Sequence, residues 1–348
     1  MPAGTPTKDL RTDRAADSAT AKYPSLRTAL WLYVFVLIAT AGLTISFSSH
    51  IDPLFLRFAG ALYIAGGFTL VATYLSRVKL ATIFGRSPSV VSLIASLLAG
   101  VALWIPVIWL TNSISLALTN AIGVLPSQPP TQATDFARFF QIGIVIPLCQ
   151  GVLFWAFAES AAIRASRRWG VVLVALMFAC YGVFGFDPGG ISSVIGLLPI
   201  GAMAAAIVWL TGSAWCGIAI GIGANLGSLF IPSSVMQNYI GADAFANPLS
   251  VGWLLAVAVT LIVALILFQI ARRRSPAEPV KPVPPRRFWW APLILSVIVV
   301  VMVVASEITV RQVTLRPVPQ PRTTTNSTGS TIPPIPAKSP PPTSGAAR

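Results

Sequence analysis

Long apolar runs dominate this chain and constrain its fold more than any other feature. Several approach or exceed the ~20 residues that an α-helix needs to cross the hydrocarbon core of a bilayer. In lipid, only helices and closed β-barrels satisfy all their backbone polar groups, and barrel strands alternate apolar and polar residues. This alternation does not occur here, so the sequence predicts an all-α, polytopic transmembrane helical bundle.

The apolar runs predict about 8–9 membrane spans. The predicted spans cover about 28–47, 55–75, 89–110, 139–161, 169–186, 190–210, 212–231, 250–270 and 288–306. Segment 111–124 is apolar but short, which favours an interfacial or re-entrant segment rather than a further span.

Basic residues set the expected orientation. Seventeen of the 24 Lys and Arg residues precede the first span or follow spans 2, 4 and 8, and nine spans put all of them on one side. The positive-inside rule then predicts a cytoplasmic N-terminus and an extracytoplasmic C-terminus in the cell membrane. The net charge of +14 is carried by connections between apolar runs, which indicates contact with membrane lipids and no nucleic-acid partner.

Composition divides the chain into five segments. We expect a disordered cytoplasmic arm, a transmembrane core, a basic Pro-rich cytoplasmic linker, a C-terminal transmembrane helix outside the functional core, and a Pro/Thr-rich disordered extracytoplasmic tail. In this order they cover residues 1–26, 27–270, 271–287, 288–306 and 307–348. The tail contains a glycosylation sequon at Asn326.

Polar side chains within the apolar runs are the functional candidates, because burial in lipid makes them costly. Gln150 and Asn225 are near the middle of their spans and need partners inside the bundle. Arg57, at a span end, can reach the interface with its charged head. Glu159 is five residues before Arg164, which is its expected local partner in a structural role.

The seventh span is rich in small residues. Its sequence contains the G-x-x-x-G spacings Gly217–Gly221 and Gly223–Gly227, which permit close approach of two helix backbones. The segment "WLTGSAWCGIAIGIGANL" resembles the last motif helix of the CPBP family, the CAAX-processing and bacteriocin-processing intramembrane proteases. In that family a "TGSLW"-like turn leads into H-x-x-x-N. Here Gly221 takes the His place and Asn225 is retained.

Two further segments complete the resemblance, which covers about residues 85–235. The family's middle motif is F-x-x-x-H, and "FACYG" resembles it with Phe178 retained and Gly182 in the His place. The first motif is E-E-x-x-x-R after a proline. "PLCQGVLFW" has this arrangement, with Gln150 and Gly151 at the Glu places and Trp155 at the Arg place. Pro147 and Phe154 of this motif are retained.

The resemblance implies an intramembrane metalloendopeptidase fold in which a glutamate activates water and two histidines build the metal or oxyanion environment. Gln150 cannot act as a general base, and glycine supplies no ligand. His50 is the only histidine in the chain, so no two-histidine site can form. We therefore expect a catalytically inactive pseudoprotease or scaffold without a cofactor. Its expected partner is another membrane protein or a lipidated peptide.

Two alternatives remain open. The first alternative is an active CAAX-type endopeptidase with atypical site residues, for example with zinc held by the three thiolates of Cys149, Cys180 and Cys216. A small transporter or channel is the third hypothesis, and it predicts a water-accessible pathway lined by Gln150 and Asn225.

Overall fold

The computed structural model describes residues 23–47, 51–122, 139–184, 190–230, 251–274 and 290–314. These residues are helical apart from short connections, and an isolated β-bridge joins Gly85 to Ser213. The all-α prediction is confirmed for this part of the chain. Most of the arm, most of the linker, His50 and the tail after residue 314 lie outside the described residues.

Each of the nine predicted spans is helical in its described residues. Six are single helices: α2 (Leu26–Phe47), α6 (Val90–Ile122), α11 (Gly190–Thr211), α12 (Ala214–Phe230), α14 (Val251–Arg274) and α15 (Trp290–Thr314). The fifth span is α10 (Arg167–Tyr181), which is continued by the 3-10 turn η4 (Gly182–Phe184). The second span is built from α3 (Pro53–Ala59), the π-helix η1 (Gly60–Gly67) and α4 (Phe68–Leu75). The fourth is built from the π-helix η2 (Gln141–Val145), α8 (Ile146–Gly151), the π-helix η3 (Val152–Ala158) and α9 (Glu159–Ala165). A short helix, α5 (Leu80–Phe84), lies between spans 2 and 3.

Five of these helices are long and apolar enough to cross a membrane, which is compatible with an integral membrane protein. They are Leu26–Phe47, Phe55–Leu75, Val90–Thr111, Gln141–Ala165 and Val194–Thr211. Four further apolar helices are shorter within the described residues: Trp169–Tyr181, Ala214–Gly227, Leu254–Ile270 and Trp290–Ala305. The count of nine membrane crossings stays a prediction.

Two boundaries differ from the sequence prediction. Segment 111–124 is not separate, because α6 continues without a break from Val90 to Ile122. The break expected after residue 110 contains no Gly or Pro, so nothing local stops the helix there. Likewise α15 continues past the apolar run to Thr314, three residues before Pro317.

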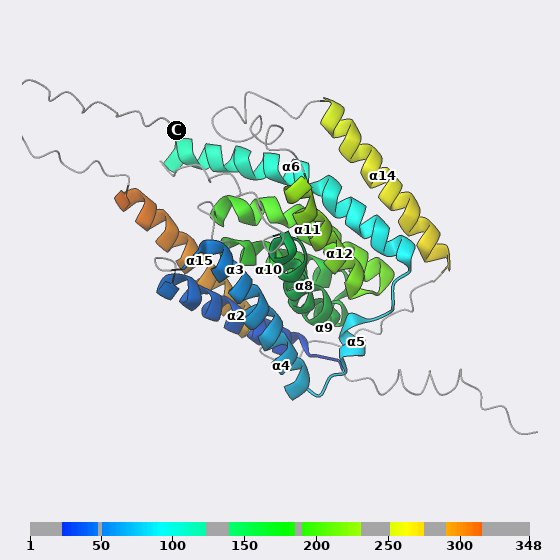
Figure 1. Cartoon of the computed structure of the whole chain (residues 1–348). Helices are drawn as coiled ribbons and strands as arrows, with labels where there is room; N and C mark the ends of the chain where they lie inside the picture. Colours follow the sequence, from blue (N-terminus) through cyan, green and yellow to red (C-terminus); the bar gives the residue numbers. More distant parts are fainter. Residues whose placement is uncertain are drawn as a thin grey trace, which may run out of the picture.

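The fourth span is the centre of the bundle. Residues 153–158 are all buried, and a helix that is apolar and buried on every side is enclosed by its neighbours. Figure 1 shows α8, α9, α10 and α12 in the middle, with α15 beside α2 at one edge and α14 beside α6 at the other.

Glycines bring α6 and α12 into backbone contact. A Cβ atom on Gly100 would overlap the Ile220 carbonyl oxygen and lie 2.8 Å from the Ala224 nitrogen. A Cβ atom on Gly223 would overlap the carbonyl oxygen of Leu97. The close approach predicted from the glycine spacing is thus confirmed for Gly223.

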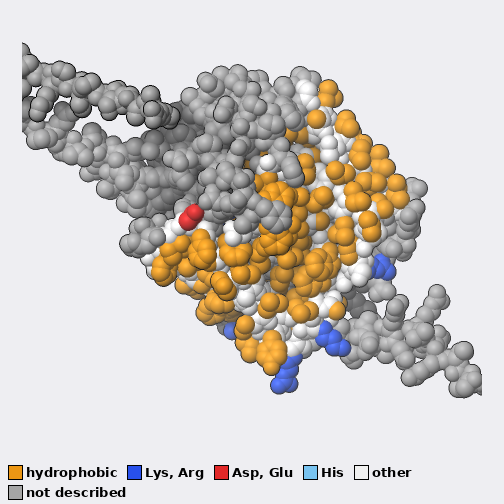
Figure 2. All heavy atoms as spheres, in the orientation of Figure 1, with side chains coloured by type: hydrophobic (Ala, Val, Ile, Leu, Met, Phe, Trp, Pro, Cys, Tyr) orange, Lys and Arg blue, Asp and Glu red, His pale blue; other side chains and the backbone are white. Residues whose placement is uncertain are grey.

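Charge is segregated along the bundle. Figure 2 shows a face covered by hydrophobic side chains, with Lys and Arg at its lower and right-hand edges and an acidic group at the opposite end. Arg77, Lys79 and Arg86 lie exposed in the connection between α4 and α6. We refer to this end of the bundle, which also includes the α11–α12 turn, as the basic end. The cytoplasmic position of this end follows from the positive-inside rule and stays a prediction.

Candidate functional site

The first and middle motif segments meet in an aromatic cluster. The ring of Phe154 in η3 contacts Phe178 of α10 edge-on, with ring centroids 5.4 Å apart. Trp155 lies 5.1 Å from Phe178, and Tyr181 lies 5.5 Å from Phe154. Trp155 is only 2% exposed. The structure therefore brings Phe154, Trp155 and Phe178 together, and these residues form a packed apolar core.

Glycines allow α12 to pack directly against this region. A Cβ atom on Gly217 would lie 2.8 Å from Cγ of Trp155, and one on Gly151 would overlap Cγ1 of Ile218. A Cβ atom on Gly221 would lie 3.3 Å from Cβ of Pro147. A side chain at Gly151 or Gly217 would therefore force neighbouring groups to move. Close packing thus leaves no space for a side chain at either position.

The remaining family-equivalent positions lie on the same helices. Gln150 is half-buried on α8, and Gly182 is buried where α10 ends. Asn225 is half-buried on α12, and its Nδ2 donates a hydrogen bond to the carbonyl oxygen of Gly221 at 3.2 Å. Their convergence on one reactive cavity stays a prediction from the resemblance.

The three cysteines have different surroundings. Sγ of Cys149 lies 3.3 Å from the position of a Cβ atom on Gly66, whereas Cys180 is close to Tyr33. Cys216 lies among the hydroxyl groups of Ser96, Thr211 and Ser213. Within the described ranges, no three His, Cys, Asp or Glu side chains gather as metal ligands would. The zinc hypothesis thus finds no ligand cluster in this part of the chain.

The expected pairing of Glu159 with Arg164 is wrong. Glu159 is fully buried, and neither carboxylate oxygen has a hydrogen-bond partner. The Arg164 guanidinium instead lies over the ring of Tyr23, 3.2 Å from its centroid, as a cation–π contact. The physical reason is helical spacing, because residues three or four apart share a helix face and residues five apart do not.

Sequence reasoning missed two tyrosines near the motif residues. The Tyr33 hydroxyl in α2 donates a hydrogen bond to the carbonyl oxygen of Met177 at 2.8 Å and links α2 to α10. Tyr181, at the end of α10, lies beside Phe154 with ring centroids 5.5 Å apart. The expected reach of Arg57 to the interface stays a prediction. The only sequence signal for these roles is a tyrosine within an apolar run.

The turn "TGSAW" between α11 and α12 has a clear structural role. Gly212 has a φ angle of +67° and Gly85 one of +70°, values that favour glycine. The backbone N–H of Arg86 donates to the Gly212 carbonyl oxygen at 2.9 Å. Trp215 stacks on Phe84 with ring centroids 4.8 Å apart. The turn therefore joins the connection before α6 to the connection before α12.

A cavity lies beside this turn, away from the family-equivalent positions. Sequence reasoning missed it, because its walls come from three helices whose packing the spacing of residues does not reveal. Neither Gln150 nor Asn225 lines it. No family model, curated protein or solved structure matches this chain.

Proposed function

We propose that this chain is an integral membrane protein that binds a membrane partner near the positions equivalent to the CPBP motifs and has no peptidase activity. The observation that supports this most directly is the burial of Trp155 at the place of the family's arginine. Its ring packs against Phe178 and lies beside Gly217. The place that resembles the family's arginine position is thus occupied by an aromatic core in this chain.

The chemistry of the remaining positions supports the same proposal. Hydrolysis of a peptide bond needs a base to activate water and a group to stabilise the developing negative charge. The amide of Gln150 is not a base, and Gly182 and Gly221 have no side chain to offer a metal or an oxyanion. The buried carboxyl of Glu159 is nine residues after Gln150 and is separated from it by the whole of η3, so it cannot take the same place.

A peptidase assay tests the catalytic half of the proposal. The purified full chain in liposomes is incubated with a prenylated peptide and with a transmembrane peptide, and products are measured by mass spectrometry. We expect no product above the rate without protein, and no change in Gln150→Ala. Product that disappears in Gln150→Ala would overturn the proposal. Stoichiometric zinc that is lost in Cys149→Ser would favour the active endopeptidase.

Photo-crosslinking tests the binding half. A benzophenone amino acid replaces Gln150, and in a control protein it replaces Ile45, which is 80% exposed on α2. Crosslinking is carried out in the membranes of the native host. We expect a discrete protein or peptide adduct from position 150 and only lipid adducts from position 45. Lipid adducts alone at both positions would contradict partner binding near the family-equivalent positions.

A further inference from the structure

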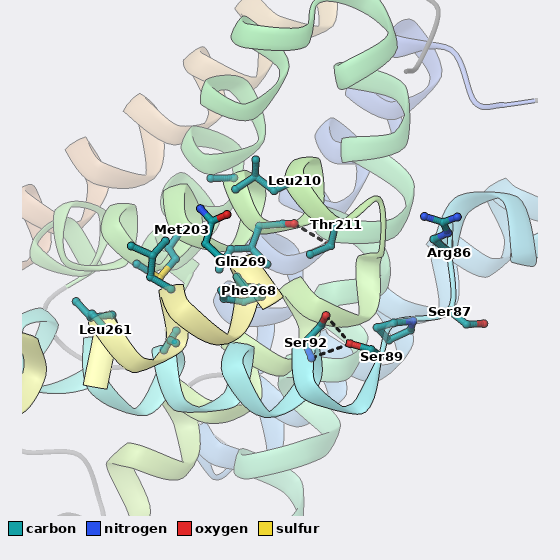
Figure 3. A pocket seen from close by; sticks show the side chains of 16 residues that line it. Arg86, Ser87, Ser89, Ser92, Met203, Leu210, Thr211, Leu261, Phe268 and Gln269 are labelled. Atoms are coloured by element: carbon teal, nitrogen blue, oxygen red, sulfur yellow. Dashed lines mark hydrogen bonds between the residues drawn. The ribbon is translucent and has the colours of Figure 1, made fainter. Parts of the chain in front are cut away.

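The cavity at the basic end is enclosed by three helices and one connection. Its volume is about 400 Å³, within the ~300–1,000 Å³ of small-molecule sites. The walls are α6, α11 and α14, and the rim is the connection 86–89. Figure 3 shows Ser89 and Ser92 at the start of α6, with Leu261 and Phe268 of α14 and Met203 of α11 around the interior.

The cavity is polar at one end and apolar at the other. Arg86, Ser89 and Ser92 lie at the start of α6, where the Ser89 hydroxyl accepts a hydrogen bond from the backbone N–H of Ser92 at 3.1 Å. The walls show the same change from polar to apolar over eight positions. On α11 it runs from Thr211 to Met203, and on α14 from Gln269 to Leu261. Eight residues of helix cover ~12 Å, which is the depth of this gradient.

Two side chains that line the cavity also reach the outer surface of the bundle. Leu210, next to Thr211 near the polar end, and Leu265, midway along the α14 wall, are 40% and 59% exposed. The small side chains of Ala99, Ala206 and Ala264 line the interior. In a bilayer, the exposed leucines would face hydrocarbon, so an acyl chain could reach the cavity beside them without passing through water.

The rim is held in place by backbone contacts. The hydrogen bond from Arg86 to Gly212 and the bridge between Gly85 and Ser213 fix the connection 86–89 against the end of α11. The hydroxyl groups at the rim are therefore pre-organised, which lowers the ordering cost of binding a ligand.

We propose that this cavity binds an anionic membrane phospholipid, with its phosphate at the rim near Arg86 and Ser89 and one acyl chain in the apolar half. The apolar walls can pack against one acyl chain, and the exposed Leu210 and Leu265 put the edge of the cavity next to lipid. The rim belongs to the basic end, where the positive-inside rule puts the anionic lipids of the cytoplasmic leaflet. This site is separate from the family-equivalent positions Gln150, Gly182, Gly221 and Asn225 and does not depend on the proposed function.

Native mass spectrometry of the full chain tests the proposal. The purified protein is equilibrated with mixed micelles that contain equal amounts of phosphatidylglycerol and phosphatidylcholine, and the bound lipids are counted. We expect one retained phosphatidylglycerol. Arg86→Gln should weaken its binding by about fivefold, the effect of about one charge near a membrane surface. Lys79→Gln is the matched control, because Lys79 is exposed at the same end but does not line the cavity.

A second variant tests the acyl-chain half. Ala206→Phe fills the interior and should reduce the retention of both lipids, while far-ultraviolet circular dichroism checks that the helices are intact. Equal retention of the two lipids, or equal effects of Arg86→Gln and Lys79→Gln, would overturn the proposal. So would displacement of phosphatidylglycerol by inorganic phosphate, which would indicate an anion site without a chain, or by a prenylated peptide, which would indicate a peptide site.

Discussion

Replacement of Gly100 by alanine tests the backbone contact between α6 and α12. The new Cβ atom would overlap the Ile220 carbonyl oxygen, lie 2.8 Å from the Ala224 nitrogen and lie 3.0 Å from Cα of Gly223. Non-bonded heavy atoms prefer about 3.5–4.0 Å, so relief of the overlap with the Ile220 oxygen requires the two helices to separate by roughly 1 Å or more. A rigid backbone cannot rotate away as a side chain can.

The expected cost follows from this overlap. Overpacking of a well-packed site costs about 1–3 kcal/mol, and backbone overlap favours the upper end. Alanine offsets at most about 1 kcal/mol of this, because it is the better helix former. We therefore expect Gly100→Ala to lower the free energy of unfolding by about 2 kcal/mol, measured by reversible unfolding in mixed micelles and followed by circular dichroism.

The matched control is Gly42→Ala. Gly42 lies in α2, and a Cβ atom there would meet nothing within 4 Å, so the free energy of unfolding should stay equal or rise. The double variant Gly100→Ala/Gly223→Ala should cost less than the sum of the single variants, because one separation of the helices accommodates both methyl groups. If Gly100→Ala unfolds like Gly42→Ala, the proposed backbone contact is refuted.

Three further substitutions probe the buried polar and aromatic groups. Trp155→Arg introduces a charge inside the aromatic cluster and should cost about 3–5 kcal/mol as an unpaired buried ion, seen as loss of monodisperse protein in size-exclusion chromatography. Glu159→Met removes a buried carboxyl that has no hydrogen-bond partner and should stabilise the protein by about 1–3 kcal/mol in thermal unfolding. The control Ser160→Ala should change the stability little. A loss of stability in Glu159→Met would contradict this reasoning. Tyr33→Phe removes the hydrogen bond to α10 and should cost about 0.5–1.5 kcal/mol in the same assay, with the 67% exposed Tyr63→Phe as the neutral control.

The helices of this fold could be predicted because lipid leaves the backbone few choices. Each apolar run of sufficient length had to satisfy its own hydrogen bonds, and each is helical. Helix ends were less predictable. The continuation of α6 to Ile122 was not predicted, because the span was ended at about the thickness of a bilayer, whereas a helix stops at a breaker or a cap.

The site was only partly predictable for a different reason. Phe154 and Phe178 lie on different helices, and their ring contact depends on how η3 packs against α10, which no spacing within one segment determines. Burial of Glu159 without a partner and the cavity beside Arg86 depend on how separate helices pack, and this is encoded in many weak contacts rather than in any short segment. The π-helical turns in the second and fourth spans also shift which residues share a face.

The bridge between Gly85 and Ser213 has a consequence for the order of biosynthesis. Its two partners are 128 positions apart (213 minus 85), so the connection before α6 is made long before the turn that fixes it. During synthesis α6 is therefore made while the rim of the cavity is still incomplete. A nascent chain released before Gly212 would retain α6 but lack the hydrogen bond to Arg86. The rim is thus completed after α6 and α11 and before α14, so the three walls of the cavity and its rim assemble in a fixed order along the chain.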